Sequence, residues 1–224
     1  MSVMEFVAAT DAARSLGVTT RQVQYLVARG DLRAVARGLI DRASLDRHIA
    51  TRQGSRRRAW SETTAWAAAA ILSDLPAPWL GPTQHSRLKS TLRRLTAVEL
   101  VSRTRGRAQV HRYQGHSRAA ERLRDEVVDT SGATAALGLT EAADRVDGYV
   151  AAPELHKLVT RHALIDDADG RYTLRATEMD LATVRTLAEN APVLGALDLA
   201  ESLDIRERQT SLNFLDDKLK RLNA

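Results

Sequence analysis

The chain has 224 residues, of which 44% are hydrophobic and 27% charged, a composition typical of a folded protein with room for more than one small domain. It contains no cysteine, which excludes disulfides, thiol catalysis and thiolate metal sites. The longest apolar run, Trp66 to Leu72, is far shorter than the roughly 20 residues that cross a bilayer. Residues 1–6 include an acid and lack the basic start of a signal peptide, so we expect a cytoplasmic protein with no membrane partner.

The charge is divided unevenly along the chain. Residues 1–118 carry 20 Lys and Arg against 8 Asp and Glu, a net charge of +12. Residues 119–224 carry 13 against 20, a net charge of −7. A basic half of this size favours a polyanion such as double-stranded DNA as its partner, while an uneven surface charge without function is the alternative.

The first 51 residues predict two helices followed by a hairpin. Residues 9–17 have apolar positions at helical spacing, and Gly17 can end this helix in the left-handed conformation. Thr19 or Thr20 is expected to cap the second helix. That helix would end at Gly30 and bury three apolar residues, Val23, Leu26 and Val27. Two short apolar runs around Arg37-Gly38 predict a hairpin, and Ser44 is expected to cap a helix over residues 45–52.

The second of these helices has the composition of one that enters a DNA groove. The major groove accepts one α-helix, and Arg and Gln side chains read its base edges. Threonines at the helix N-terminus and arginines after the helix would bind the phosphate backbone. The predicted DNA contacts of this unit are Thr19, Thr20, Arg21, Gln22, Gln24, Tyr25, Arg29, Arg33 and Arg37. The alternative is a polar helix face that only meets solvent.

Residues 52–58 form a basic linker whose Arg56, Arg57 and Arg58 would either follow DNA phosphates or only keep a hinge soluble. Beyond it, residues 59–116 again have the order of a winged helix. We expect a helix from Ser61 to about Asp74, a proline-broken loop, a second helix over residues 83–100, and then two strands, 100–104 and 108–113.

The predicted DNA contacts of this second unit are Arg87, Lys89, Arg93, Arg105 and Arg107, with Arg94 beside them. They combine a basic helix face with a basic turn between the two strands. The alternative is the ordinary exposed face of an amphipathic helix, opposite Leu88, Leu92 and Leu95.

The last part, residues 117–224, predicts an α+β domain. A helix over 117–127 and a small-residue segment are followed by a strand or loop and a helix within 148–164. Residues 165–177 predict a hairpin with Asp169-Gly170 at its turn. Two helices finish the chain, the last with Leu212, Leu215 and Leu219 on one side. The expected fold class is therefore mainly α with short β-hairpins (α+β), with two winged-helix-like units before a C-terminal α+β domain.

No pattern in the chain indicates catalysis. There is no nucleophile motif, phosphate-binding glycine loop or paired-carboxylate pattern, so we expect no enzymatic activity and no cofactor. His111 and His116 lack neighbouring ligands, and the aspartates at 166, 167 and 169 lack the distal Glu of a calcium loop; no metal is expected at either. Trp60, Trp66 and Trp79 are interpreted as packing residues rather than base-stacking platforms.

The segment ATDAARSLGVTTRQVQYLVARGDLRAVARGLIDRASLDRHI resembles the winged helix-turn-helix of excisionase- and MerR-like proteins. It has their alanine-rich first helix, Leu-Gly-Val, a threonine turn, an Arg-x-Val helix and Gly-x-Leu before the wing. The resemblance covers residues 5–51, and the wing is shorter than is usual in this family.

The remainder resembles AbiEi-like antitoxins of type IV toxin–antitoxin systems, chiefly in TLRAT (Thr173 to Thr177) and ALDLAESLDIRER (Ala196 to Arg208). The resemblance implies an autorepressor of its own operon that neutralises a nucleotidyltransferase-like toxin. The acidic residues Glu201, Asp204 and Glu207 are candidates for docking a partner, but they could equally pack on the chain's own basic half or face water. An excisionase-like architectural factor, or a regulator without a toxin, is the alternative function. A homodimer stays open, since helix-turn-helix proteins often read inverted repeats.

Overall fold

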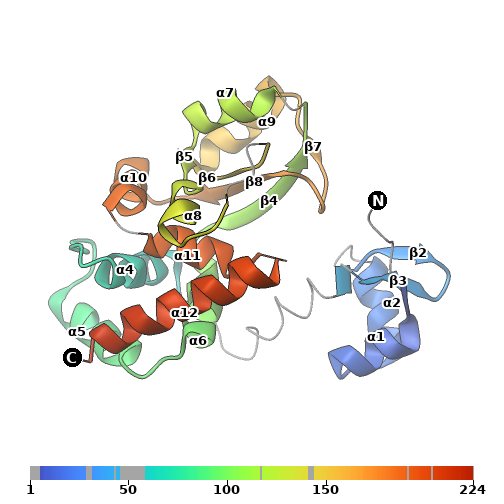
Figure 1. Cartoon of the computed structure of the whole chain (residues 1–224), viewed down its shortest axis with the longest axis horizontal. Helices are drawn as coiled ribbons and strands as arrows, with labels where there is room; N and C mark the ends of the chain where they lie inside the picture. Colours follow the sequence, from blue (N-terminus) through green and yellow to red (C-terminus); the bar gives the residue numbers. More distant parts are fainter. Residues whose placement is uncertain are drawn as a thin grey trace. The chain divides into compact units, whose positions relative to one another are not determined.

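The computed structural model describes residues 6–28, 32–42, 44–45, 59–116, 118–140, 144–190, 192–202 and 204–223. The chain divides into two compact units, Met1–Arg56 and Arg57–Ala224 (Figure 1). Among the described residues, no helix combines the length and the apolar character that a membrane crossing requires.

The first unit is built from two helices and a small antiparallel sheet. The helices are α1 (Ala9–Leu16) and α2 (Thr20–Ala28), and the strands are β1 (Phe6–Ala8), β2 (Ala34–Ala36) and β3 (Leu39–Asp41), paired in the order β1-β3-β2. Gly17 ends α1 with a φ of 63°, and Gly38 turns the hairpin with a φ of 79°. The two predicted helices and the hairpin are confirmed, whereas strand β1 was not predicted.

The core of this unit forms where α1 and α2 pack on β3. Ala12, Val23 and Ile40 are buried, each from a different element. Leu26 is buried as well and Val27 packs against the cluster, so the predicted buried side of α2 is confirmed. The Thr19 hydroxyl accepts a hydrogen bond from the Gln22 N–H at 3.2 Å, as expected of an N-cap. The predicted helix over 45–52 falls outside the described residues, apart from its first position.

The second unit begins with three helices, α4 (Glu62–Leu72), α5 (Pro82–Leu92) and α6 (Ala97–Thr104), followed by the 3-10 turn η1 (Arg105–Arg107). Helix α4 is buried along its length from Ala65 to Leu72, and Ser61 caps it. The tryptophans lie in this packing, as expected. Trp66 is buried and donates to Thr177 Oγ1 at 3.1 Å, while Trp79 donates to Thr63 O at 3.1 Å.

A five-stranded mixed sheet holds the rest of the second unit together. Its strands are β4 (Gln109–Gln114), β5 (Val128–Asp129), β6 (Val146–Ala151), β7 (Ile165–Asp166) and β8 (Tyr172–Thr177). Their order is β5-β6-β8-β4-β7, with β6 and β8 parallel and the other pairs antiparallel.

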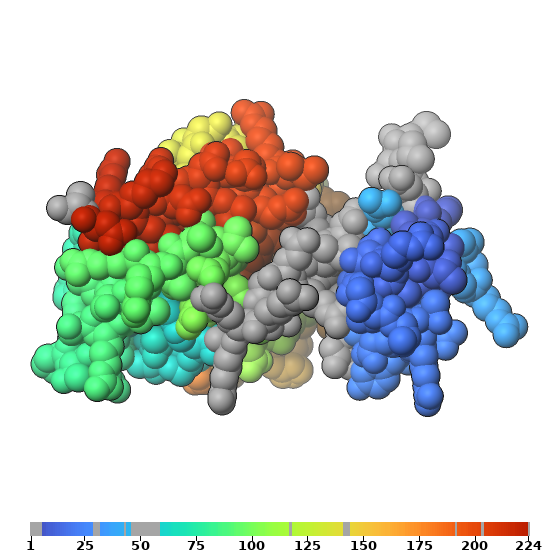
Figure 2. Space-filling view, turned by 90° about the horizontal axis from the view of Figure 1, so that it is seen from below, coloured from blue at the N-terminus to red at the C-terminus, as the bar shows by residue number. Residues whose placement is uncertain are grey.

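Helices cover both faces of this sheet. Helices α7 (Ala119–Glu126) and α9 (Leu155–Arg161), the latter entered through the 3-10 turn η2 (Ala152–Glu154), pack on one face (Figure 1). The remaining helices are α8 (Gly132–Ala136), α10 (Leu181–Asn190), α11 (Val193–Leu199) and α12 (Ile205–Arg221). Together with α4 to α6 they surround a core on the other face, into which Tyr149 of β6 projects. Figure 2 shows α12 lying along one face of the unit beside the α5–α6 segment.

Three predictions for this unit are wrong. Residues 83–100 are two helices, because Thr96 and Glu99 form a reciprocal capping box that starts α6. Residues 100–104 are consequently helical, so the predicted hairpin around 105–107 does not form. Three helices rather than two follow β8.

The predicted hairpin of residues 165–177 is also wrong, although both of its strands exist. Strand β4 lies between β7 and β8 and pairs with both of them. The expected wing strand 108–113 is therefore a central strand of the sheet, and residues 59–116 share one sheet with the residues after 118. The fold is α+β, with helices and two small sheets.

Candidate nucleic-acid interface

The exposed side of α2 gathers most of the residues predicted to contact DNA. Thr20, Arg21, Gln22, Gln24 and Tyr25 are all exposed. By helical geometry, Arg21, Gln24 and Tyr25 lie on the side opposite the buried Val23 and Leu26. Tyr25 is 56% exposed although its side chain is large and mostly apolar. An Arg–Gln surface of this kind offers hydrogen-bond groups suited to base edges.

The hairpin beside α2 adds exposed arginines. Arg33 precedes β2 and Arg37 stands at the β2–β3 turn, and both are exposed. The described residues of the first unit contain five arginines and two acids, Asp11 and Asp41. One acid is already engaged, since Asp11 lies 2.7 Å from Arg14. The described part of this unit is thus basic, whereas the predicted contact Arg29 and the linker arginines Arg56, Arg57 and Arg58 lie outside it.

The predicted contacts of the second unit have different surroundings. Arg87 and Arg93 are exposed, and Lys89 and Arg105 are half-buried. Arg107 was predicted at the tip of a basic hairpin, but the structure buries it, with 1% of the residue exposed. Its assignment as a DNA contact is therefore corrected, because a phosphate cannot reach a guanidinium enclosed by protein.

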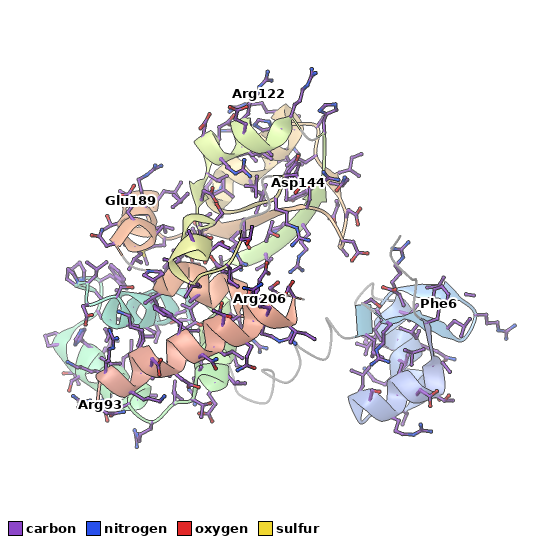
Figure 3. The ribbon with its side chains drawn as sticks, in the orientation of Figure 1. Phe6, Arg93, Arg122, Asp144, Glu189 and Arg206 are labelled. Atoms are coloured by element: carbon purple, nitrogen blue, oxygen red, sulfur yellow. The ribbon has the colours of Figure 1, made fainter. Side chains whose placement is uncertain are left out.

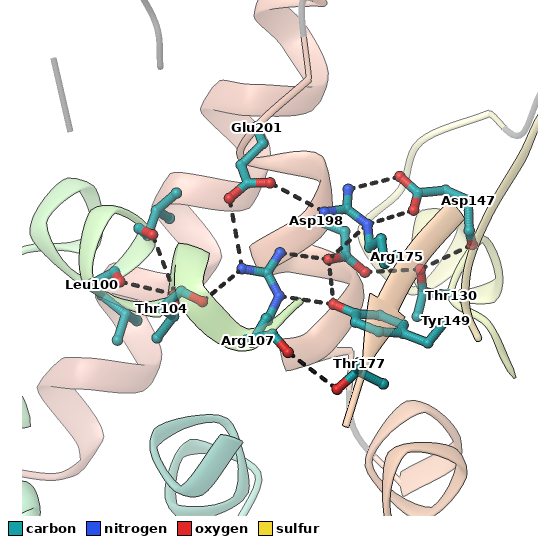
Figure 4. Close-up of polar contacts among 11 residues, drawn as sticks. Leu100, Thr104, Arg107, Thr130, Asp147, Tyr149, Arg175, Thr177, Asp198 and Glu201 are labelled. Atoms are coloured by element: carbon teal, nitrogen blue, oxygen red, sulfur yellow. Dashed lines mark hydrogen bonds and ion pairs between the residues drawn. The ribbon is translucent and has the colours of Figure 1, made fainter. Parts of the chain in front are cut away.

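Arg107 belongs instead to a buried network of charged groups (Figure 4). Its guanidinium lies 2.6 Å from Asp198 Oδ1 and 3.6 Å from Glu201 Oε1. It also donates to the Tyr149 hydroxyl at 2.8 Å and to Thr104 O at 3.2 Å. These four partners come from β6, α6, α11 and the residues after α11, so the network connects the sheet with the helical core.

Arg175 of β8 is the second cation of this network. Its guanidinium binds both oxygens of Asp147, at 2.6 and 2.9 Å, and lies 3.1 Å from Glu201. It is also 3.3 Å from Asp198 Oδ1, so Asp198 bridges both arginines. Asp198 accepts two further hydrogen bonds, from the Tyr149 hydroxyl at 2.7 Å and from Thr130 at 2.9 Å.

Burial and neighbouring charges shift the pKa values of Tyr149 and Arg107 within this network. Burial raises the pKa of Tyr149 well above its usual value, so the phenol stays neutral. Burial alone would lower the pKa of Arg107, but the surrounding Tyr149, Glu201 and Asp198 outweigh it and raise that pKa. The Arg107, Arg175 and Asp198 side chains are at most 3% exposed, so the arrangement serves to hold the fold rather than to bind a substrate.

The three acids predicted to dock a partner also have roles within the chain. Glu201 is ion-paired with Arg107 and Arg175. Asp204 caps α12 by accepting from the N–H groups of Arg206 and Glu207. The Glu207 carboxylate accepts from the Ser202 hydroxyl. The alternative that these acids pack on the chain itself holds for Glu201, whose partner Arg107 lies in the basic half of the sequence.

Three central members of the network, Tyr149, Arg175 and Asp198, were not predicted from the sequence. Two of them could have been recognised in the sequence, because Arg175 lies in the apolar strand YTLRAT and Asp198 lies in the apolar helix VLGALDL. A charged residue in an apolar element needs a partner, and here the two are each other's partners. The segments Thr173–Thr177 and Ala196–Arg208 therefore meet in this network.

Comparisons of the chain with protein-family models, with curated proteins and with solved structures found no match. In the part of the chain that the structure describes, no group of three or more His, Asp or Glu side chains is placed to hold a metal ion.

Proposed function

We propose that the protein is a sequence-specific DNA-binding transcriptional regulator whose first unit is a winged helix-turn-helix. The observation that carries this proposal is the exposed Arg21, Gln22 and Gln24 surface of α2, which follows a tight glycine turn. The β2–β3 hairpin would act as the wing, with Arg33 and Arg37 on phosphates. By its resemblance to AbiEi-like regulators, the DNA it reads would be the operator of its own operon.

The test replaces two base-reading candidates in the full chain, Arg21→Ala together with Gln24→Ala. Each bidentate contact to a base contributes about 1–3 kcal/mol of discrimination, so the ratio of operator to scrambled-DNA affinity should fall about 100-fold. Fluorescence anisotropy with the upstream region of its own gene measures that ratio. Circular dichroism should stay unchanged, because both side chains are exposed.

Arg14→Ala is the matched control for this variant. It removes one positive charge from the same unit, but from α1, where the side chain is exposed and paired with Asp11. We expect the affinity ratio to stay within twofold of the wild type. A double variant on α2 that keeps the wild-type ratio would refute α2 as the reading helix.

We propose in addition that the second unit neutralises a nucleotidyltransferase-like toxin. Support comes from the meeting of Thr173–Thr177 with Ala196–Arg208, since the two segments that carry the antitoxin resemblance both contribute residues to the buried network. The Arg21→Ala, Gln24→Ala chain should still rescue cells that produce the toxin encoded beside its gene. Loss of rescue in this variant would show that protection requires DNA binding. A phage integrase gene in that position would favour the excisionase-like alternative.

A further inference from the structure

Helix α5 of the second unit carries a basic surface without acids. Residues 82–96 contain Arg87, Lys89, Arg93 and Arg94 and neither Asp nor Glu. Arg87 and Ser90 are both exposed and three residues apart, so they are neighbours on the helix surface, and the exposed Arg94 follows at the helix end. Between Arg87 and Arg94 the exposed side chains are Ser90 and Arg93, while Lys89 is half-buried.

Among the described residues, the basic groups of this surface are not paired with acids, in contrast to several other basic groups of the unit. Within the described residues, no carboxylate lies within 4.0 Å of a basic group of residues 82–96. Several basic side chains elsewhere in the unit have acidic partners: Lys157 lies 2.9 Å from Glu154, and Arg171 lies 3.1 Å from Asp144. Exposed basic residues that serve only solubility would be expected to alternate with acids, as they do on those elements.

The end of α12 extends this surface. Arg93 Nε donates to Leu222 O at 2.9 Å, and Asn223 donates back to Arg93 O at 3.1 Å. These two bonds hold the end of α12, with the exposed Arg221 one residue before Leu222, against the end of α5. Basic residues at a helix C-terminus also complement the helix dipole, but this does not account for Arg87, which stands in the middle of α5.

Helix α6, which would be the groove-reading helix of this unit, is not free to enter a groove. Ala97, Leu100 and Ser102 are buried, and α12 packs against the helix. The Ala97 N–H at its start donates to the Asp216 carboxylate of α12 at 2.7 Å, so an intramolecular anion already occupies the position a phosphate would take. Of these two helices, α5 is therefore the one left to contact DNA.

We propose that α5 binds the phosphate backbone of the DNA that the first unit reads, without contacting base edges. The choice of DNA as the polyanion rests on the proposed function. Arg87 and Arg94 neutralise phosphates, and the exposed Ser90 hydroxyl between them donates to a phosphate oxygen. The second unit thus adds affinity but no sequence preference.

The test is the salt dependence of binding by the full chain carrying Arg87→Gln and Arg94→Gln. Each lost phosphate contact lowers the slope of log K against log salt by about 0.9, so the slope should become shallower by about 1.8. At 0.1 M salt, affinities for operator and scrambled DNA should both fall roughly 10- to 100-fold, leaving their ratio unchanged. Ser90→Glu, which places an acid between the two arginines, should weaken both affinities as well.

The matched control is Arg122→Gln with Arg185→Gln, which makes the same change in net charge. Both side chains are exposed, on α7 and α10, and Figure 3 shows Arg122 at the opposite end of the unit from Arg93. The control should keep the wild-type slope.

The outcomes separate this inference from the proposed function. If the α5 variants keep the wild-type slope while the α2 variant still loses its operator preference, the α5 surface is refuted and the regulator stands. If wild-type protein does not distinguish operator from scrambled DNA, the proposed function fails instead. If the α5 variants lose binding only to vesicles of phosphatidylserine and phosphatidylcholine, the surface serves lipid and the inference is refuted.

Discussion

Asp198→Asn should lower the free energy of unfolding of the second unit by about 3–5 kcal/mol, the cost of breaking a buried ion pair from one side. The amide removes the charge that bridges Arg107 and Arg175. It also replaces one hydrogen-bond-accepting oxygen by an amide NH2 group, which is a donor. Because Tyr149 and Thr130 both donate to Asp198, one of them would then face another donor. The two arginines, whose side chains are at most 3% exposed, would then be left with fewer carboxylates as partners.

Urea unfolding followed by tryptophan fluorescence measures this loss, because all three tryptophans, at positions 60, 66 and 79, belong to the second unit. The matched control is Asp204→Asn, the same chemical change at an exposed N-cap. Asn caps helices about as well as Asp, so we expect a change below about 0.5 kcal/mol. A loss for Asp198→Asn no larger than this control would mean that the network contributes no net stability.

Gly170→Ala should cost about 3 kcal/mol, at the upper end of the usual range for overpacking. A Cβ at this position would lie 2.2 Å from Tyr113 O and 2.8 Å from Gln114 N. Both atoms belong to the backbone of β4, which pairs with strands on both sides and has little freedom to move. The cost is one of space rather than of backbone conformation, because only Gly17, Gly38 and Gly138 have a positive φ among the described glycines.

The control for this substitution is Gly132→Ala. No atom lies within 4 Å of a Cβ at Gly132, which begins α8, so the change should be neutral or stabilise by up to about 1 kcal/mol. Urea midpoints at equal slope give both values. Equal midpoints for the two variants would show that the segment between β7 and β8 can move away from β4.

The first unit was predicted well because its signals are local. The Gly17 turn, the Thr19 cap and the apolar side of α2 act within a few residues, and each was confirmed. In the second unit, one local signal was overlooked, namely the capping box of Thr96 and Glu99. One helix over residues 83–100 was therefore predicted where the structure has α5 and α6.

The remaining errors have a long-range cause. Asp169-Gly170 is a favourable turn sequence between β7 and β8. The turn sequence does not reveal that β4 lies between these two strands and pairs with both. Arg107 lies in a basic segment that looks exposed, and its buried partner Asp198 is 91 residues further along the chain. A sequence pattern that spans only a few residues cannot predict a contact between residues so far apart. The exposed residues of α2, in contrast, could be predicted from the helical period of about 3.6 residues alone.

The central position of β4 has a consequence for the order of folding. Residues 109–114 leave the ribosome long before residues 172–177, with which β4 forms its longest pairing. A sheet that depends on such distant contacts closes late, because the entropy of a long loop opposes it. The first unit completes its contacts within 56 residues. During synthesis, the unit with the α2 surface would therefore be folded while the rest of the chain is still being made.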